Sequence, residues 1–124
     1  MNIGTTGAFG EKTALEWLVK HGYELVSRNF QTRFGEVDII CRDKRYLVFV
    51  EVKTRSAGYI GSGREAVTRS KQMKLIKAAM QYLQSRPTEL QPRFDVIEVV
   101  LDGDKVSVEH IENAFGAGGG YGFF

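Results

Sequence analysis

The pattern of hydrophobic and polar positions predicts a helix in the first part of the chain. Over Thr6–His21, one stripe collects residues spaced three or four positions apart, as on one face of a helix. The members of this stripe are Ala8, Glu11, Leu15, Leu18 and Gly22. Thr5 or Thr6 can cap the start of the helix, and Gly22 can end it. Glu11 is the one acid on an otherwise apolar face.

Shorter alternating runs predict strands after this helix. A first strand is expected over Tyr23–Phe30, followed by a loop over Gln31–Gly35. Two further runs, Glu36–Arg42 and Tyr46–Lys53, alternate and are rich in β-branched residues. The short polar break Asp43-Lys44 between them is typical of a hairpin, although without a glycine it leaves the turn type open.

A second helix is predicted in the middle of the chain. Thr54–Gly63 carries three glycines and two serines and predicts a mobile loop before it. The helix is expected over Arg64–Ser85. Its inward positions are Met73, Ile76, Ala79, Met80 and Leu83, and its outward positions are Lys71, Lys74 and Lys77.

The remaining pattern completes the fold. Strands are expected over Arg93–Leu101 and Lys105–Ile111, around the turn Asp102-Gly103-Asp104. The order α-β-β-β-α-β-β predicts an α/β fold of the α+β mixed-sheet kind, with helices packed against a central sheet. We expect a single domain over residues 1–115. Residues 116–124, rich in glycine and aromatics, are expected to form a flexible tail.

Composition narrows the class of protein. A chain of 124 residues has room for one core. No apolar run approaches the roughly 20 residues of a membrane-spanning helix, and Met1–Gly10 lacks the features of a secretory signal. The single cysteine, Cys41, excludes an internal disulfide and a cysteine-based zinc cluster. We therefore expect a cytoplasmic protein that does not insert into membranes.

Basic residues are concentrated in one part of the chain. Residues 53–86 hold eight Lys or Arg against the single acid Glu65, although the net charge of the whole chain is only +2. Such a run can be a solvated helix face or a stripe that contacts phosphates, because clustered cations gain affinity for a polyanion by releasing its counterions. Our candidates for phosphate contacts are Arg55, Arg64, Lys71 and Lys74.

The predicted hairpin gathers charged side chains on one face. Side chains alternate across a strand, so Glu36 and Asp38 share a face, as do Glu51 and Lys53. A two-residue turn at Asp43-Lys44 would place Glu36 opposite Glu51. A four-residue loop over Asp43–Tyr46 would place Asp38 opposite Glu51 instead, and either register brings all four charges together.

The surroundings of these charges favour a metal site. The other face of the hairpin is apolar throughout, with Val37, Ile39, Cys41, Val48, Val50 and Val52. Ile40, Leu47 and Phe49 fill the middle of the charged face, so the strand pair is expected at the centre of the sheet. Three buried carboxylates raise one another's pKa, and a hard divalent cation such as Mg²⁺ or Mn²⁺ would offset their charge. The alternative is a salt-bridged rim at the edge of the sheet.

Each residue type suggests a role in phosphodiester cleavage. A metal held by Asp38 and Glu51 would polarise a phosphoryl oxygen and activate water. Lys53 could stabilise charge on the scissile phosphate or orient the attacking water. The backbone carbonyl of Val52 is a further candidate ligand, and Glu36 could join the ligands or position a water.

Several of these motifs together resemble a known family. Glu36-Val37-Asp38 followed by Phe49–Arg55 resembles the PD-(D/E)xK nuclease superfamily of the restriction-endonuclease-like fold, with valine in place of the proline. Further matching motifs make the stretch from Gly7 to Phe115 similar to the YraN-like bacterial family, whose biochemical role is unassigned and which is grouped with archaeal Holliday junction resolvases. These motifs are Gly10-Glu11, Gly22-Tyr23, Asn29, Gly35–Ile40, Val48–Arg55 and Arg93–Val96. The resemblance implies metal ligands at Asp38 and Glu51 with Lys53 beside them. By analogy with the resolvases, it implies that Glu11 reaches the same site; a capping or salt-bridge role for Glu11 is the alternative.

We therefore expect a Mg²⁺- or Mn²⁺-dependent endonuclease that acts on DNA and selects branched or junction structures. No helix-turn-helix, zinc finger or other sequence-reading module is visible, which argues against base-specific recognition. Analogy suggests a homodimer, whose two sites would suit a branched substrate. Two alternatives stay open at this point: a catalytically silent nucleic-acid-binding module, and a structural partner in a DNA-processing complex.

Overall fold

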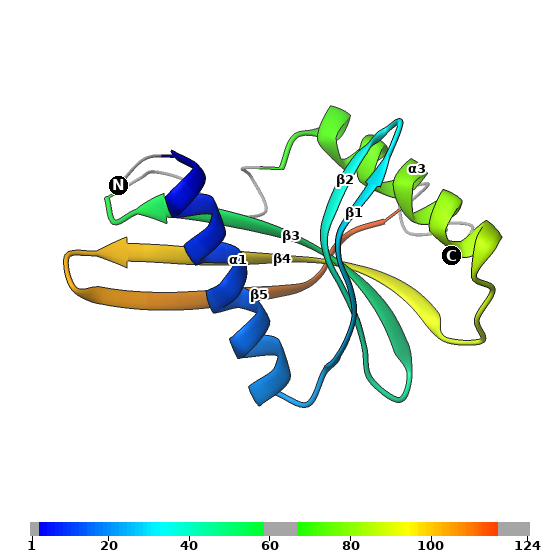
Figure 1. Cartoon of the computed structure of the whole chain (residues 1–124), viewed down its shortest axis with the longest axis horizontal. Helices are drawn as coiled ribbons and strands as arrows, with labels where there is room; N and C mark the ends of the chain where they lie inside the picture. The colour runs from blue at the N-terminus through cyan, green and yellow to red at the C-terminus, as the bar shows by residue number, and fades with distance from the viewer. Residues whose placement is uncertain (1–2, 59–66, 117–124) are drawn as a thin grey trace.

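The computed structural model describes residues 3–58 and 67–116, and for Ile3–Thr6 it describes the backbone alone. Its elements follow the order helix, three strands, helix, two strands (Figure 1). They are α1 (Ile3–Lys20), β1 (Glu24–Thr32), β2 (Gly35–Arg42), β3 (Tyr46–Ser56), α3 (Arg69–Ser85), β4 (Gln91–Asp102) and β5 (Lys105–Phe115). This order confirms the predicted α-β-β-β-α-β-β arrangement.

The strands form one mixed five-stranded sheet in the order β1-β2-β3-β4-β5. Only β3 and β4 are parallel, and the other neighbours are antiparallel. A parallel pair needs a long crossover connection, and α3 lies in the connection between these two strands. The central position of β3 confirms the expectation drawn from the apolar residues on both of its faces.

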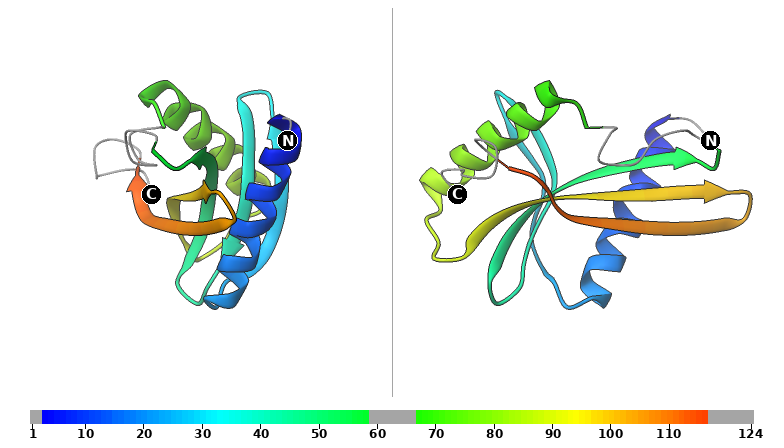
Figure 2. Two further views of the ribbon diagram at one scale, coloured as in Figure 1. Left: turned by 90° about the vertical axis from the view of Figure 1, so that its left-hand side faces the viewer. Right: turned by 180° about the vertical axis from the view of Figure 1, so that it is seen from behind.

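The two helices cover opposite faces of the sheet, as the end-on view of Figure 2 shows. One buried core lies between the sheet and α3, and it contains Val37, Ile40, Leu47, Phe49, Val67, Leu75, Ile76, Ala78, Ala79, Tyr82, Phe94 and Val96. The other lies on the α1 side and contains Ala14, Leu18, Ile39, Cys41, Val48, Val50, Ile97 and Val99. The β1–β2 hairpin crosses the β3–β4–β5 part at a steep angle (Figure 1), which reflects the usual twist of a sheet.

For α1, the predicted C-terminal boundary is confirmed and the predicted N-terminal boundary is not. The helix begins at Ile3, so Thr5 and Thr6 lie within it and are not its caps. At its other end Gly22 has φ of 94°, the left-handed conformation that favours glycine. The N–H of Gly22 donates to the Val19 carbonyl, and the next N–H donates to the Leu18 carbonyl. Gly22 therefore ends the helix as predicted.

The middle of the chain departs from the prediction. β3 continues through Thr54–Ser56, where we predicted a loop, because its parallel pairing with β4 extends to Ser56. The predicted second helix corresponds to α3, which begins at Arg69, and the Thr68 hydroxyl caps it by accepting from the Lys71 N–H. The predicted start at Arg64 lies outside the described residues. Residues 59–66 lie outside the described part of the chain, and so does the predicted tail apart from Gly116.

The buried face of α3 is also rotated from the prediction. Met73 and Met80 are each 37% exposed rather than inward. Leu75, Ala78 and Tyr82 are buried beside Ile76 and Ala79. The two adjacent alanines lack bulk and are fully buried, so the helix approaches the sheet along this line. The ring of Tyr82 then packs edge-on against that of Phe49.

The remaining strand boundaries differ modestly. β1 extends to Thr32 and β2 begins at Gly35, so the predicted loop over Gln31–Gly35 is in fact a tight hairpin turn. β5 extends to Phe115, beyond the predicted end at Ile111, through a bulge opposite β4. Neither described helix has the length and hydrophobicity that crossing a bilayer requires.

A buried charged cluster ties β4 to β5 and to the segment after α1. Asp95 is fully buried, and its carboxylate accepts two bonds from Arg93, at 2.9 and 2.8 Å. His110 Nε2 lies 2.7 Å from Asp95 Oδ2, and the Asn113 N–H donates to Oδ1 at 3.0 Å. Arg93 also donates to the Tyr23 hydroxyl at 2.6 Å. Burial alone would raise the pKa of Asp95, but these bonds hold it below its ordinary value.

Glycine in α1 sets the distance between this helix and the sheet. A Cβ on Gly10 would overlap Thr54 Oγ1 and lie 3.2 Å from Thr54 Cβ, whereas a Cβ on Gly7 would meet nothing within 4 Å. We expect Gly10→Ala to lower the free energy of unfolding by about 1–3 kcal/mol through overpacking. Gly7→Ala should raise it by up to about 1 kcal/mol because alanine favours helix. Urea denaturation measures both changes.

The double variant Gly10→Ala/Thr54→Ala identifies the cause. It removes the hydroxyl that the new methyl group would meet, so it should recover most of the stability lost in Gly10→Ala. Equal loss in the single and double variants would show that the Gly10–Thr54 contact does not limit the approach of α1.

Candidate active site

The β2–β3 hairpin has the register of the longer predicted loop. Ile39 pairs with Val50 and Cys41 pairs with Val48, and the same register places Asp38 opposite Glu51. The loop closes without glycine because Asp43 Oδ1 accepts from the N–H groups of Arg45 and Tyr46, at 2.8 and 2.7 Å. An aspartate side chain thus supplies the turn whose type the sequence left open.

The two strands separate at Asp38. Their pairing ends at Ile39–Val50, and beyond it the Val52 N–H donates to Asp38 Oδ2 at 2.8 Å. Val37 packs in the core on the α3 side, whereas Ile39 packs on the α1 side. The prediction that Val37 shares a face with Ile39 was therefore wrong, because β2 bends at the aspartate between them. This bend leaves the Asp38 carboxylate in the opening between β2 and β3.

The neighbouring strand bends at the same level. Asn29 of β1, which the hairpin register places opposite Asp38, has φ of 50°, a left-handed conformation that asparagine tolerates better than most residues. Its amide Nδ2 donates to Glu11 Oε1 at 2.7 Å and to Glu36 Oε1 at 3.0 Å. Gln31, two residues further along β1, donates to Glu36 Oε2 at 2.6 Å. Two side-chain amides therefore hold the carboxylates in place.

Three carboxylates from α1 and β2 converge around the bend. Glu11, Glu36 and Asp38 each offer an oxygen, and these oxygens all lie within 4.8 Å of one another. All three residues are partly buried. Glu11 reaches the cluster from α1 as the resemblance implied, and Glu36 lies beside Asp38 as the strand pattern predicted.

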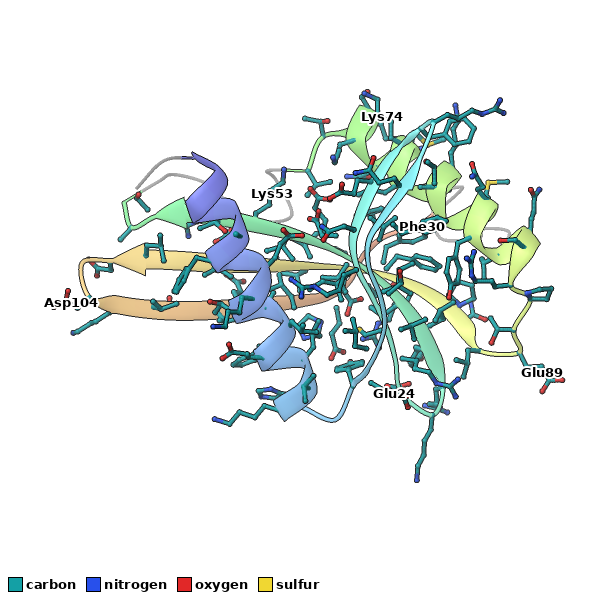
Figure 3. All side chains as sticks on the ribbon, viewed as in Figure 1. Glu24, Phe30, Lys53, Lys74, Glu89 and Asp104 are labelled. Atoms are coloured by element: carbon teal, nitrogen blue, oxygen red, sulfur yellow. The ribbon has the colours of Figure 1, made fainter. Side chains whose placement is uncertain are left out.

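Glu51 and its two lysines form the other half of the site. Glu51 is 5% exposed. Its Oε1 lies 3.4 Å from Lys53 Nζ and 3.9 Å from Lys71 Nζ, while its Oε2 is buried without a hydrogen-bond partner in the described structure. In the view of Figure 3, Lys53 rises from β3 between the ribbons of α1 and α3. Lys71, predicted to face outward, turns toward the site from the first turn of α3.

Burial and repulsion from neighbouring carboxylates raise the pKa values of Asp38 and Glu51. Burial, and then the charge of Glu51, raise the pKa of Asp38 from 3.8 to about 7, against the bond from the Val52 N–H. Burial also raises the pKa of Glu51, although Lys71 and Lys53 oppose that shift. Such a raised pKa means that the surroundings oppose an uncompensated negative charge on the acid. A bound cation would offset that charge.

These shifts predict how stability depends on pH without added metal. Because the folded state holds the Asp38 proton more tightly than the unfolded chain, this group contributes most stability below about pH 4. The contribution is lost as the pH rises through 7. Between pH 6 and pH 8 we expect a loss on the order of 1 kcal/mol in unfolding free energy. Urea denaturation across this range, compared between wild type and Asp38→Asn, measures it.

The outcome is read from the difference between the two proteins. The amide introduced by Asp38→Asn cannot titrate, so the variant should show a flatter pH dependence than the wild type. Parallel pH profiles for the two proteins would contradict a raised pKa at Asp38.

The donor set fits a hard divalent cation. It consists of carboxyl oxygens, which when ionised are the ligands that Mg²⁺ and Mn²⁺ prefer. The buried Oε2 of Glu51 has no hydrogen-bond partner in the described structure. The N–H and C=O of one strand residue leave the same edge of the strand. The Val52 carbonyl therefore faces the opening toward Asp38. Glu11, Glu36 and Asp38 are the residues closest together, and Glu51 lies outside that group of three.

The predicted phosphate contacts are placed differently from one another. Arg55 Nε donates to Glu98 Oε1 at 2.7 Å, and Glu98 is only 1% exposed, so this guanidinium is bound into the sheet. Lys71 lies at the site, and Lys74 is exposed on α3, where Figure 3 labels it. Arg64 lies outside the described residues.

Two residues that had no role in the predicted site, Asn29 and Gln31, hold the acids in the structure. Lys71, predicted as a phosphate contact, pairs with Glu51. The spacing of the two amides does indicate their position, because they alternate along β1 as Glu36 and Asp38 do along β2. This spacing becomes informative only when Gln31–Gly35 is identified as a tight turn that pairs the two strands. No local signal indicated the direction of Lys71.

Comparisons with known proteins place this chain within a wider group of sequences. The sequence profile described as "Uncharacterised protein family UPF0102" matches residues 10–99. A UPF0102 protein of Caldanaerobacter subterraneus subsp. tengcongensis is 44% identical over 119 residues, which cover 93% of this chain and 98% of that protein. A UPF0102 protein of Syntrophotalea carbinolica is 46% identical over 114 residues, covering 91% of this chain and 93% of that protein. The matched region includes every acid of the candidate site.

Proposed function

We propose that this chain, which belongs to the uncharacterised protein family UPF0102, is a metal-dependent phosphodiesterase that cuts DNA. The observation that carries the proposal is the convergence of Glu11, Glu36 and Asp38 at the opening between β2 and β3. Lys53 and the buried Glu51 lie directly beside this opening on β3. The resemblance to the PD-(D/E)xK nucleases supports the same reading of these residues.

The metal we propose is Mg²⁺ or Mn²⁺, held by Asp38 with Glu11 and Glu36, and reached by Glu51 and the Val52 carbonyl. Bound there, it would polarise a phosphoryl oxygen and lower the pKa of a water molecule. The cluster supplies more negative charge than its lysines offset, which favours a divalent cation over water alone.

The side chains of the chain itself supply the rest of the chemistry. Lys53 carries a positive charge next to the acids, where it can stabilise the charge that develops on the scissile phosphate. Asn29 and Gln31 hold Glu11 and Glu36 against their mutual repulsion. Lys71 offsets the charge of Glu51 and presents a cation at the border between the acids and α3.

The direct test is cleavage of labelled linear, flapped and four-way-junction DNA by the full chain. Incubations contain Mg²⁺, Mn²⁺ or EDTA. We expect cutting with either metal, none in EDTA, and loss of cutting in Asp38→Asn. Asp104→Asn is the matched control, because Asp104 is an exposed acid in the β4–β5 turn, at the far end of the molecule from Lys74 in Figure 3.

Metal binding can be measured without catalysis. A cation that binds the deprotonated acids stabilises the folded state, so Mn²⁺ should raise the melting temperature at pH 8 in wild type and not in Asp38→Asn. Metal-induced stabilisation without cutting of any DNA would favour a silent binding module of the same fold. Absence of both effects would refute the proposed function.

The branched-DNA preference and the homodimer remain parts of this proposal. A two-fold dimer would supply one site to each of two strands of a junction. Preference for the junction over linear DNA in the cleavage assay, together with a dimeric mass in solution, would support both.

A further inference from the structure

The turn between β1 and β2 presents an aromatic ring beside α3. Its two residues are Arg33 and Phe34, and Phe34 is partly exposed. The Thr32 hydroxyl accepts from the N–H groups of Phe34 and Gly35, at 3.0 and 3.2 Å, and donates to the Gly35 carbonyl at 2.9 Å. These bonds hold the backbone of the turn, and with it the point at which the Phe34 side chain leaves the chain beside α3.

A pocket of about 340 Å³ adjoins this ring. Its lining residues come from the turn and from the exposed face of α3, and none of them is acidic: Arg33, Phe34, Lys77, Met80, Gln81 and Gln84. The guanidinium carbon of Arg33 lies 4.9 Å from the centre of the Phe34 ring, and Lys77 Nζ lies 5.8 Å from it. The pocket thus combines an aromatic face, two cations and two amides that can bond to the edge of a base.

Among the described residues, Arg33 and Lys77 of the pocket, and Lys74 beside it on α3, have no carboxylate partner. Within residues 3–58 and 67–116, no described acid lies within 4.0 Å of Arg33, Lys74 or Lys77, in contrast to Lys53 and Lys71. A cation held only by an aromatic ring keeps much of its charge available to an anion. Phosphate can therefore draw Arg33 or Lys77 away from the ring and leave the ring face open.

A row of lysines joins this pocket to the candidate active site. Lys71, Lys74 and Lys77 follow one another at intervals of three residues on α3. The first lies at Glu51, and the last lies over the Phe34 ring. Lys74 passes the hairpin turn, since a Cβ on Gly35 would lie 3.9 Å from Lys74 Cβ. From Lys71 to Lys77 the helix rises about 9 Å along its axis. A stacked strand covers this distance with roughly two to three nucleotides.

We infer that this pocket binds an unpaired nucleobase, stacked on Phe34, two to three nucleotides from the phosphate at Lys71. The inference deepens the proposed function and rests on it for the identity of the ligand. A base in continuous duplex is covered on both faces by its neighbours, whereas a base in a flap or at a branch can stack on an aromatic side chain. The substrate class is therefore DNA with an unpaired segment beside the cut.

The test measures binding in EDTA, where cutting cannot interfere. Fluorescently labelled flapped DNA and blunt duplex of the same length are titrated with the full chain. Phe34→Leu keeps an apolar side chain but removes the aromatic face, and it should weaken flap binding about 5- to 150-fold while changing duplex binding little. Lys77→Gln should weaken flap binding as well, and Lys105→Gln, at the distant start of β5, should leave it unchanged.

A second measurement does not depend on any variant folding. Flap DNA that carries 5-iodouracil at single positions is irradiated with the wild-type chain. Crosslinks should map to Phe34 when the modified base lies two or three nucleotides from the cut or from the junction. Equal binding of flap and duplex, together with crosslinks that avoid Phe34, would overturn the inference.

The outcomes separate this inference from the proposed function. Flap binding that depends on Phe34, without metal-dependent cutting by the wild type, would support the pocket and refute the nuclease. Cutting of flapped DNA at the same rate and with the same affinity in wild type and Phe34→Leu would support the nuclease and refute the pocket.

Discussion

Lys53→Ala should cut DNA about 10²- to 10³-fold more slowly than the wild type, the loss typical when one group that stabilises transition-state charge is removed. The amine of Lys53 lies 3.4 Å from Glu51 Oε1, beside the acids but outside the cluster of three. The loss should therefore appear in the rate and not in metal binding. Single-turnover cleavage with saturating Mn²⁺ measures the rate.

Two further measurements make this result specific. Stabilisation by Mn²⁺ at pH 8 should persist in Lys53→Ala, whereas Asp38→Asn should lose both stabilisation and cutting. Lys105→Ala, which removes an exposed lysine at the start of β5, controls for the loss of one positive charge. If Lys53→Ala cuts as fast as Lys105→Ala, the charge beside Glu51 has no part in the reaction.

Asp95→Ala should lower the free energy of unfolding by about 3–5 kcal/mol, since breaking a buried ion pair leaves an uncompensated charge. Asp95 is fully buried and Arg93 is 8% exposed. The substitution removes the acceptor of two Arg93 bonds, of the His110 contact and of the Asn113 N–H. Such a loss is a large part of the 5–15 kcal/mol typical of small proteins, about a fifth or more. Urea denaturation at pH 7 measures it.

The matched comparison is Asp104→Ala, which removes an exposed aspartate and should change the same free energy by less than about 0.5 kcal/mol. The double variant Arg93→Met/Asp95→Leu removes both charges and should recover much of the loss, because an apolar pair can replace a buried ion pair. A change in Asp95→Ala no larger than in Asp104→Ala would show that the cluster does not support the fold.

Much of the fold could be predicted because the strands carry strong local patterns. The β2 and β3 runs are alternating and apolar, and their order with the two helices follows directly from the chain. The hairpin register was narrowed to two choices, and the choice between them depended on Asp43. Its carboxylate closes a four-residue loop by accepting from two backbone N–H groups. The alternation of apolar and polar residues gives no information about this contact.

The errors arose where tertiary contacts override local signals. The end of β3 lies within a stretch whose glycines and serines predict a loop, yet β4 pairs with it as far as Ser56. The buried face of α3 is chosen by contact between its small alanines and the sheet, not by its methionines. The bend at Asp38 depends on two strands and a helix meeting, so the strand pattern alone assigned Val37 to the wrong face.

The acids of the candidate site could be predicted from the sequence, whereas the amides that hold two of them could not. Asp38, Glu51 and Lys53 follow from alternation along one hairpin, and the resemblance added Glu11. The positions of the Asn29 and Gln31 amides depend on the β1–β2 register, which the strand pattern alone does not determine. Arg55 shows the opposite case, because a cation expected to meet phosphate is bonded to the buried Glu98.

The bond between the Val52 N–H and Asp38 gives the site a built-in spectroscopic reporter. In most of a sheet an amide bonds to a backbone carbonyl, whose charge does not change. Here the partner is a carboxylate with a pKa near 7, so the amide proton of Val52 should shift in frequency as Asp38 loses its proton. A ligand that takes over the carboxylate should shift it again. One resonance in a nitrogen–proton correlation spectrum can therefore follow the state of the acid cluster, without substrate and without altering the chain.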